Sequence, residues 1–224
     1  MAFRDVTSAI VERTSIFVVL PRVGCGHTCC LALLKKASPA QHLLFLANVN
    51  SLPFDYVARQ KLGGNHLTLT VLSQLPAIPP DVYTADDVEF ITSRALELSF
   101  TSSDLDGFAR DVGHNGHPFV WEDGRRERIL RDLDGYFAHL YGFTREELRY
   151  ILDPKDVFDD EFPSETFRVL KEREEKEFGE YRTRRLVLEA FDKLAETPRF
   201  RDEMAKRKSA FGSGIERSAA TATT

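Results

Sequence analysis

Four potential metal ligands or nucleophiles lie within six residues of the sequence, at Cys25, His27, Cys29 and Cys30. A structural zinc site normally joins two such ligand pairs from separate chain segments. No second pair follows here, because the pair His114 and His117 has no cysteine near it. A catalytic thiol would need a positioned base, and His27 is the nearest candidate. Since Cys29 and Cys30 also open an apolar run, we expect buried structural thiols and no metal site.

A second group of polar and charged residues surrounds the pair Gly63-Gly64. The spacing matches neither phosphate-binding glycine motif, GxGxxG or GxxxxGK[ST], and instead predicts a tight turn between a helix and a strand. Side chains able to donate hydrogen bonds flank this turn, and such donors can contact phosphate oxygens or base edges of DNA. They are Arg59, Gln60, Lys61, Asn65 and His66.

Catalytic patterns are missing elsewhere in the sequence. Ser51–Phe54 only faintly resembles the Asn-Pro-Pro-Tyr/Phe motif of adenine methyltransferases, and no glycine-rich cofactor loop precedes it. The acidic stretch 156–161 lacks the DxDxDG spacing of a calcium loop, so we interpret it as a solvated connection. We therefore expect no catalytic, metal-binding or cofactor-binding residue in this chain.

The composition is that of an ordinary globular protein, but its charge is divided unevenly. The 224 residues carry a net charge of −5, with 42% hydrophobic and 29% charged residues. Residues 1–80 hold seven Lys and Arg against three Asp and Glu, a net charge of +4, whereas the remainder carries −9. A basic segment joined to an acidic one favours a polyanion-facing part beside a supporting part. No apolar run could span a membrane, no signal peptide is apparent, and three clustered cysteines favour a reducing cytoplasm.

The hydrophobic pattern of residues 1–80 predicts mixed structure. Strands are expected at 16–20 and 67–72, with a less regular apolar run at 31–34, and a helix is expected over 41–50. Pro76, Pro79 and Pro80 end this segment, and we place a domain boundary there.

From residue 81 the pattern becomes helical. Helices are expected from Thr84, where Asp87 completes a capping pair, and over 103–112, 125–141, 164–177 and 180–196. Thr144 and Glu147 form a further capping box. Residues 205–224 have too little apolar content to order themselves. The fold class expected is α+β: a partial, mixed α/β domain over 1–80, then a mostly helical domain over 81–204 and a disordered tail.

Several sequence blocks, taken in order, resemble a known family. They are Phe3–Thr7 with Glu12-Arg13-Thr14 and Pro21–His27; Phe54–Gly64 continuing to Gln74-Leu75-Pro76; Leu133–Gly142 followed by Tyr150–Asp153; and Phe178–Arg184. Together they resemble the C-terminal region of large adenine-specific DNA methyltransferases, of type IIG restriction-modification systems and of the BREX and DISARM phage-defence systems. The resemblance covers about residues 3–200. The chain departs from it at Thr28-Cys29-Cys30.

The resemblance implies a role in DNA sequence recognition. Residues 1–80 would be the later part of a target-recognition domain, and S-adenosylmethionine would bind a catalytic domain that this chain lacks. The expected partners are double-stranded DNA and that catalytic methyltransferase domain or subunit, with no membrane. The alternative is a helical protein-interaction module of a phage-defence complex, in which 125–196 docks a partner without DNA contact. The candidate DNA contacts are Arg4, Arg13, Arg22, His27, Arg59, Lys61, Asn65 and His66.

Overall fold

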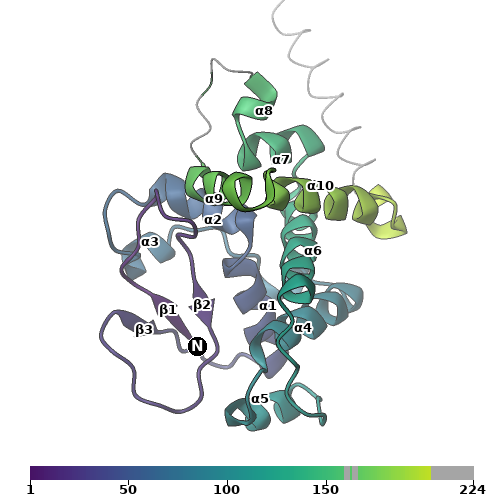
Figure 1. Ribbon diagram of the computed structural model, residues 1–224. Coiled ribbons are helices and arrows are strands. Elements are labelled where there is room, and N and C mark those ends of the chain that lie inside the picture. The colour runs from purple at the N-terminus through teal and green to yellow at the C-terminus, as the bar shows by residue number, and fades with distance from the viewer. Residues whose placement is uncertain (159–161, 163–165, 203–224) are drawn as a thin grey trace, which may run out of the picture.

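A small antiparallel sheet lies against a larger body of helices in the computed structural model of the chain (Figure 1). The structure describes residues 1–158, 162 and 166–202. The arrangement is α+β with a mostly helical C-terminal part, as the sequence predicts. The expected tail, residues 205–224, lies outside the described residues. No helix in the described ranges has the length and apolar character needed to cross a membrane.

The sheet has three short strands, with the N-terminal one in the centre. β1 (Ala2–Arg4) pairs with β2 (Phe17–Val18) on one side and with β3 (Cys29–Leu31) on the other, both antiparallel. Phe3 lies opposite Phe17, and their stacked rings, 5.1 Å apart, bury the inner face of the sheet. The expected strand 16–20 is thus limited to two residues, and the apolar run 31–34 contributes only Leu31.

Three helices follow the sheet, and one of them replaces an expected strand. They are α1 (Pro39–Val49), α2 (Leu52–Lys61) and α3 (Leu69–Leu72). The prediction of a strand at 67–72 is wrong, because the Thr68 side chain accepts a hydrogen bond from the Val71 amide and so caps a helical turn. Leu67 is buried, but Leu69 is 74% exposed, so the alternation of apolar residues did not indicate a half-buried strand.

Several of the remaining helices begin or end at the predicted local signals. The elements are η1 (Pro80–Val82), α4 (Ala85–Ser99), η2 (Ser103–Leu105), α5 (Asp106–Asp111), α6 (Asp123–Tyr141), α7 (Arg145–Leu152), α8 (Lys155–Phe158), α9 (Arg168–Phe178) and α10 (Arg182–Ala195). Of these, η1 and α8 were not expected, and the helix expected over 164–177 begins at Arg168. The capping boxes at Thr84 and Thr144 are confirmed. Gly142 and Gly179 end α6 and α9 with φ of 81° and 74°, the left-handed conformation that glycine adopts without strain.

One hydrophobic cluster runs through both halves of the chain. It joins Phe3 and Phe17 of the sheet and Leu43 of α1 to Ile91 of α4 and Phe137 of α6. A second cluster packs α7, α9 and α10 around Ala138 and also includes Leu52, the first residue of α2. The first cluster therefore contains residues from both sides of the boundary expected near residue 80.

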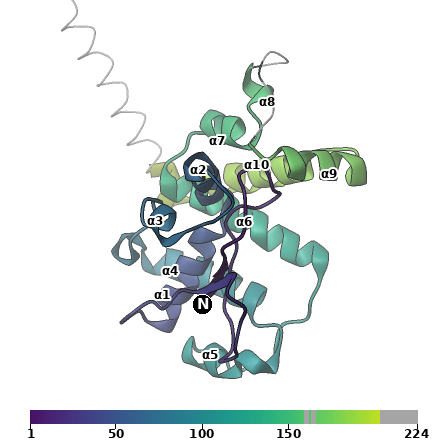
Figure 2. The ribbon, with the colours of Figure 1, turned by 90° about the vertical axis from the view of Figure 1, so that its left-hand side faces the viewer.

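The segment between β1 and β2 binds this core to the C-terminal helices. Figures 1 and 2 show it leaving the sheet, reaching past α2 toward α9 and returning. At its far end Glu12 forms an ion pair with Arg173 of α9, with 3.0 Å between Oε1 and Nη2. The N-terminal segment is therefore held at both the sheet and the helical end of the molecule.

Candidate nucleic-acid interface

Two loops that are distant in sequence meet at the C-terminal end of β1. The amide of Asp5 donates a hydrogen bond to the carbonyl of Thr28, with 2.9 Å between the atoms. The amide of Thr7 donates to the carbonyl of Asn65 at 3.0 Å, and the amide of Leu67 donates to the carbonyl of Asp5 at 2.8 Å. The residues after β1 thereby hold Thr28, the last residue of the loop 19–28, close to the turn 62–67.

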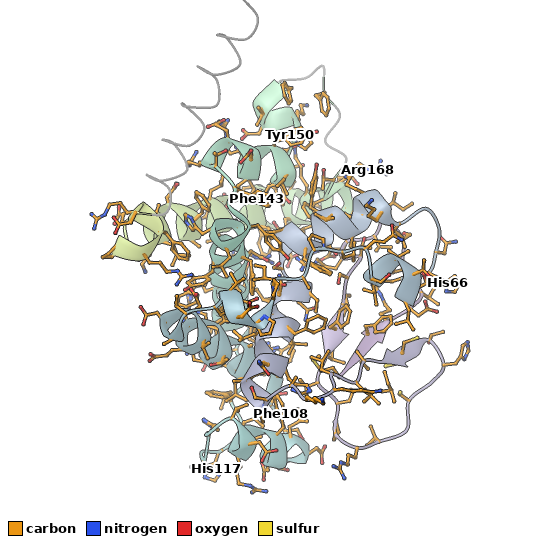
Figure 3. All side chains as sticks on the ribbon, turned by 180° about the vertical axis from the view of Figure 1, so that it is seen from behind. His66, Phe108, His117, Phe143, Tyr150 and Arg168 are labelled. Atoms are coloured by element: carbon orange, nitrogen blue, oxygen red, sulfur yellow. The ribbon has the colours of Figure 1, made fainter. Side chains whose placement is uncertain are left out.

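A side-chain contact reinforces this junction. Nδ1 of His66 lies 2.9 Å from Oδ2 of Asp5, while the His66 side chain remains 58% exposed. Figure 3 places His66 at the outer edge of the molecule, on the segment between α2 and α3. The carboxylate of Asp5 therefore orients the imidazole while leaving its outer edge open to a ligand.

Six of the predicted contact residues lie on exposed positions around these loops. The loop 19–28 swings out from the body as a wide dark arc in Figure 1 and returns at Thr28. We call the exposed set the β1 loop surface. It consists of Arg4, Arg22, His27, Lys61, Asn65 and His66.

Arg59 lies inside the protein, so the prediction that it contacts DNA is wrong. The residue is only 6% exposed. Its guanidinium group donates to Oδ2 of Asp55 at 2.9 Å, to the carbonyls of Ala9 and Thr166 at 2.9 Å, and to that of Glu12 at 2.8 Å. The pairing with Asp55 four residues earlier makes Arg59 a structural cation that ties the N-terminal segment to α2.

Arg13 also has a structural role. It is half-buried, and its guanidinium group donates to the carbonyl of Asn50 at the end of α1. Its own carbonyl accepts a hydrogen bond from Arg4. The residue lines a hollow of about 530 Å³ between β2, α1, α4 and α6, away from the loop junction at Asp5. The side chain of Arg13 is therefore engaged with α1, whereas its carbonyl contacts Arg4 of the β1 loop surface.

The cysteine cluster differs from the expectation of buried thiols. Cys25 is exposed, and Cys29 and Cys30 are half-buried free thiols at the start of β3. Desolvation, with a smaller contribution from Cys25, raises the pKa of the Cys29 thiol and so disfavours the thiolate needed for nucleophilic attack. In the part of the chain that the structure describes, no three His, Cys, Asp or Glu side chains are grouped so that they could hold a metal ion.

The blocks on which the resemblance rests meet in a buried polar network. Asp55 has no exposed surface, and its Oδ1 accepts hydrogen bonds from the amides of Thr14 at 2.9 Å and Ser15 at 2.6 Å. Asp134 of α6 accepts one from the amide of Leu52 at 2.7 Å. These residues join the N-terminal segment, α2 and α6. Their role in these sequence blocks is therefore structural.

A second buried carboxylate belongs to this network. Asp134 also accepts a hydrogen bond from Nη1 of Arg131, at 2.8 Å. Burial raises the pKa of Asp134, and the charge of Arg131 opposes that increase. The pair is one helical turn apart on α6, so the helix itself brings the two charges together.

Comparison of the chain with protein-family models, with curated proteins and with solved structures found no match. The assignment of function therefore depends on the geometry and on the resemblance.

Asp5 and Thr7 hold the two loops at the end of β1, although the sequence placed them only within the block Phe3–Thr7 and not among the candidate contacts. Both follow a strand of only three residues, which is too short to show an alternating pattern. Their partners lie far away in the sequence, such as His66, 61 residues after Asp5. No local feature of the sequence connects these positions.

Proposed function

We propose that this chain recognises duplex DNA as part of an adenine-specific DNA methyltransferase of a restriction-modification or phage-defence system. The proposal combines the resemblance of residues 3–200 to that family with the β1 loop surface. In this proposal S-adenosylmethionine and catalysis belong to a separate methyltransferase domain or subunit that works with the chain.

The convergence of the loop 19–28 and the turn 62–67 on the end of β1 carries the proposal. Arg4, Arg22 and Lys61 supply positive charge for phosphate oxygens, which positions a protein on DNA without reading its sequence. His27, Asn65 and His66 add hydrogen-bonding groups that suit phosphate oxygens or base edges. Backbone hydrogen bonds at Thr28 and at Asn65 and Leu67 attach both loops to the residues after β1.

Salt-dependent binding of duplex DNA tests the proposal. The experiment measures the affinity of the full chain for a labelled duplex by fluorescence anisotropy at several salt concentrations. Substituting Arg22→Ala together with Lys61→Ala should weaken binding and lower the salt slope by up to about two, because each lost phosphate contact removes about 0.9 from the slope. Both side chains are exposed, so each substitution should change stability by about 0.5 kcal/mol or less.

A matched control removes two other exposed cations, by Arg110→Ala on α5 together with Lys176→Ala on α9. This control should keep the affinity and the salt slope of the unsubstituted chain. An equal loss of duplex affinity in both double variants would mean that binding depends only on the net charge of the protein. That result would contradict the proposed interface.

A protein-interaction module without DNA contact is the second candidate, and exposed apolar side chains favour it. They lie on or next to the sheet and not in 125–196, the segment expected to dock a partner; they are 40–78% exposed and include Val18, Val23, Leu31 and Leu33. A largely apolar interface would be insensitive to salt and to the Arg22→Ala, Lys61→Ala pair. The titration described above therefore separates the two functions.

A further inference from the structure

A groove of about 550 Å³ lies among α4, α6 and α10, away from the β1 loop surface. Figure 1 shows α10 crossing α6, and the groove occupies the angle between them, with α4 as its third wall. Its lining is rich in cations. The charged residues are Arg94, Arg125, Arg128, Arg131 and Lys193, with Glu97, Asp132 and Glu189.

Two of the three acidic groups are neutralised within the groove. Arg125 makes two hydrogen bonds to the carboxylate of Glu97, and this contact lowers the pKa of Glu97 so that it stays ionised and paired. Nε of Arg94 lies 3.4 Å from Oδ2 of Asp132. These pairs contribute no net charge to the groove.

The third acidic group is compensated only in part, by a cation outside the groove that it shares with Glu180. Glu189 forms an ion pair with Arg185, one turn earlier on α10, with 2.9 Å between Oε1 and Nη1. Arg185 is not among the residues that line the groove. Arg128 of α6 and Lys193 of α10 are therefore left as exposed cations, and neither has a partner among the described residues. Two cations of the groove, one on each of its two crossing helices, therefore have no acidic partner in the part of the chain that the structure describes, and the lining as a whole holds five cations against three acidic groups.

Arg131 lines both this groove and the hollow of about 530 Å³. Its Nη1 is engaged by Asp134, but its Nε is buried and has no hydrogen-bond partner among the described residues. A buried donor without an acceptor costs about 1–3 kcal/mol relative to a satisfied one.

We propose that the groove of α4, α6 and α10 binds the phosphate group of a ligand through its two unpaired cations, Arg128 and Lys193. A guanidinium offers paired donors to two phosphate oxygens, and an ammonium adds a compact charge. The phosphate can belong to a nucleic-acid backbone or to a free polyphosphate compound. The groove contains none of the residues of the β1 loop surface, so the inference stands independently of the proposed function.

Calorimetric titration of the full chain with inorganic tripolyphosphate is the first test. The unsubstituted chain should bind, and Arg128→Glu with Lys193→Glu should weaken binding at least tenfold. The control, Arg110→Glu with Lys176→Glu, changes the net charge equally outside the groove and should bind as the unsubstituted chain does. Circular dichroism melting establishes that each variant is folded, and Arg128→Gln with Lys193→Gln replaces the Glu pair if that pair does not fold.

Anisotropy with labelled duplex DNA then identifies the source of the phosphate. A nucleic-acid backbone is the source if the groove variant lowers duplex affinity and reduces the salt slope by about two, while the control does not. A free polyphosphate is the source if the groove variant loses affinity for tripolyphosphate but keeps its affinity for the duplex. The inference is overturned if the unsubstituted chain binds neither probe, or if groove and control variants weaken binding equally. The Arg22→Ala, Lys61→Ala pair tests the β1 loop surface in the same assay. The results therefore show separately whether the groove and the β1 loop surface contact the duplex.

Discussion

Asp55 shows how one buried side chain can fix the path of a distant segment. Its carboxylate accepts hydrogen bonds from the amides of Thr14 and Ser15, 41 and 40 residues earlier, and from Nε of Arg59 on its own helix. Each donor is buried, so loss of the carboxylate leaves donors and one cation without an acceptor.

Substituting Asp55→Ala should therefore lower the free energy of unfolding by about 3–5 kcal/mol, the cost typical of removing one partner of a buried ion pair. Urea denaturation measures the change. Asp81→Ala, at an exposed position before α4, is the control and should change stability by about 0.5 kcal/mol or less. A loss below about 1 kcal/mol for Asp55→Ala would mean that the network adds little to stability.

At the scale of elements, the contact of α6 with α10 depends on a glycine. A Cβ atom placed on Gly135 would lie 2.9 Å from the backbone nitrogen of Phe191 and 3.2 Å from Cβ of Ala190. The two helices approach so closely at this point that a methyl group has no room. The same crossing forms one corner of the cationic groove through Ala190.

Gly135→Ala should consequently destabilise the protein by about 1–3 kcal/mol, the usual cost of overpacking, although alanine favours helix by up to about 1 kcal/mol. Gly124→Ala, in the first turn of the same helix, is the matched control because nothing lies within 4 Å of its Cβ position. Thermal melting should show the control unchanged or slightly stabilised. Equal melting temperatures for the two variants would show that α10 can move away without cost.

At the scale of the whole molecule, residues 1–80 depend on the helices that follow them. Asn48 of α1 is fully buried, and its Nδ2 donates to the hydroxyl of Tyr141 at the end of α6, at 2.7 Å. The amide of Leu52 and the guanidinium of Arg59 likewise bond to Asp134 and to the carbonyl of Thr166. These contacts add to the hydrophobic cluster that crosses residue 80.

We therefore expect the full chain to unfold in one cooperative transition and residues 1–80, expressed alone, to show none. Chemical denaturation followed by far-ultraviolet circular dichroism makes the comparison, with the full chain as reference. A sigmoidal transition for residues 1–80 would show that they form an independent domain, as the prolines at 76–80 suggest from the sequence.

Much of the helical part could be predicted because its signals are local. The caps at Thr84 and Thr144 join residues three apart, and Gly142 and Gly179 end their helices through their own backbone freedom. The exposed polar turn around Asn65 was predictable for the same reason, whereas the helical turn after Thr68 was missed because alternation of apolar residues was given more weight than the cap.

Only the tertiary structure decided which of the predicted contacts face outward. Arg59 and Lys61 are two residues apart on one helix and look alike in the sequence, yet one is buried and the other exposed. Residues two apart in a helix point in different directions, and the side that is covered depends on Ala9, Glu12 and Thr166, which lie 47–107 residues away. Such distant contacts leave no local pattern, so the assignment of Arg59 to the core required the fold itself.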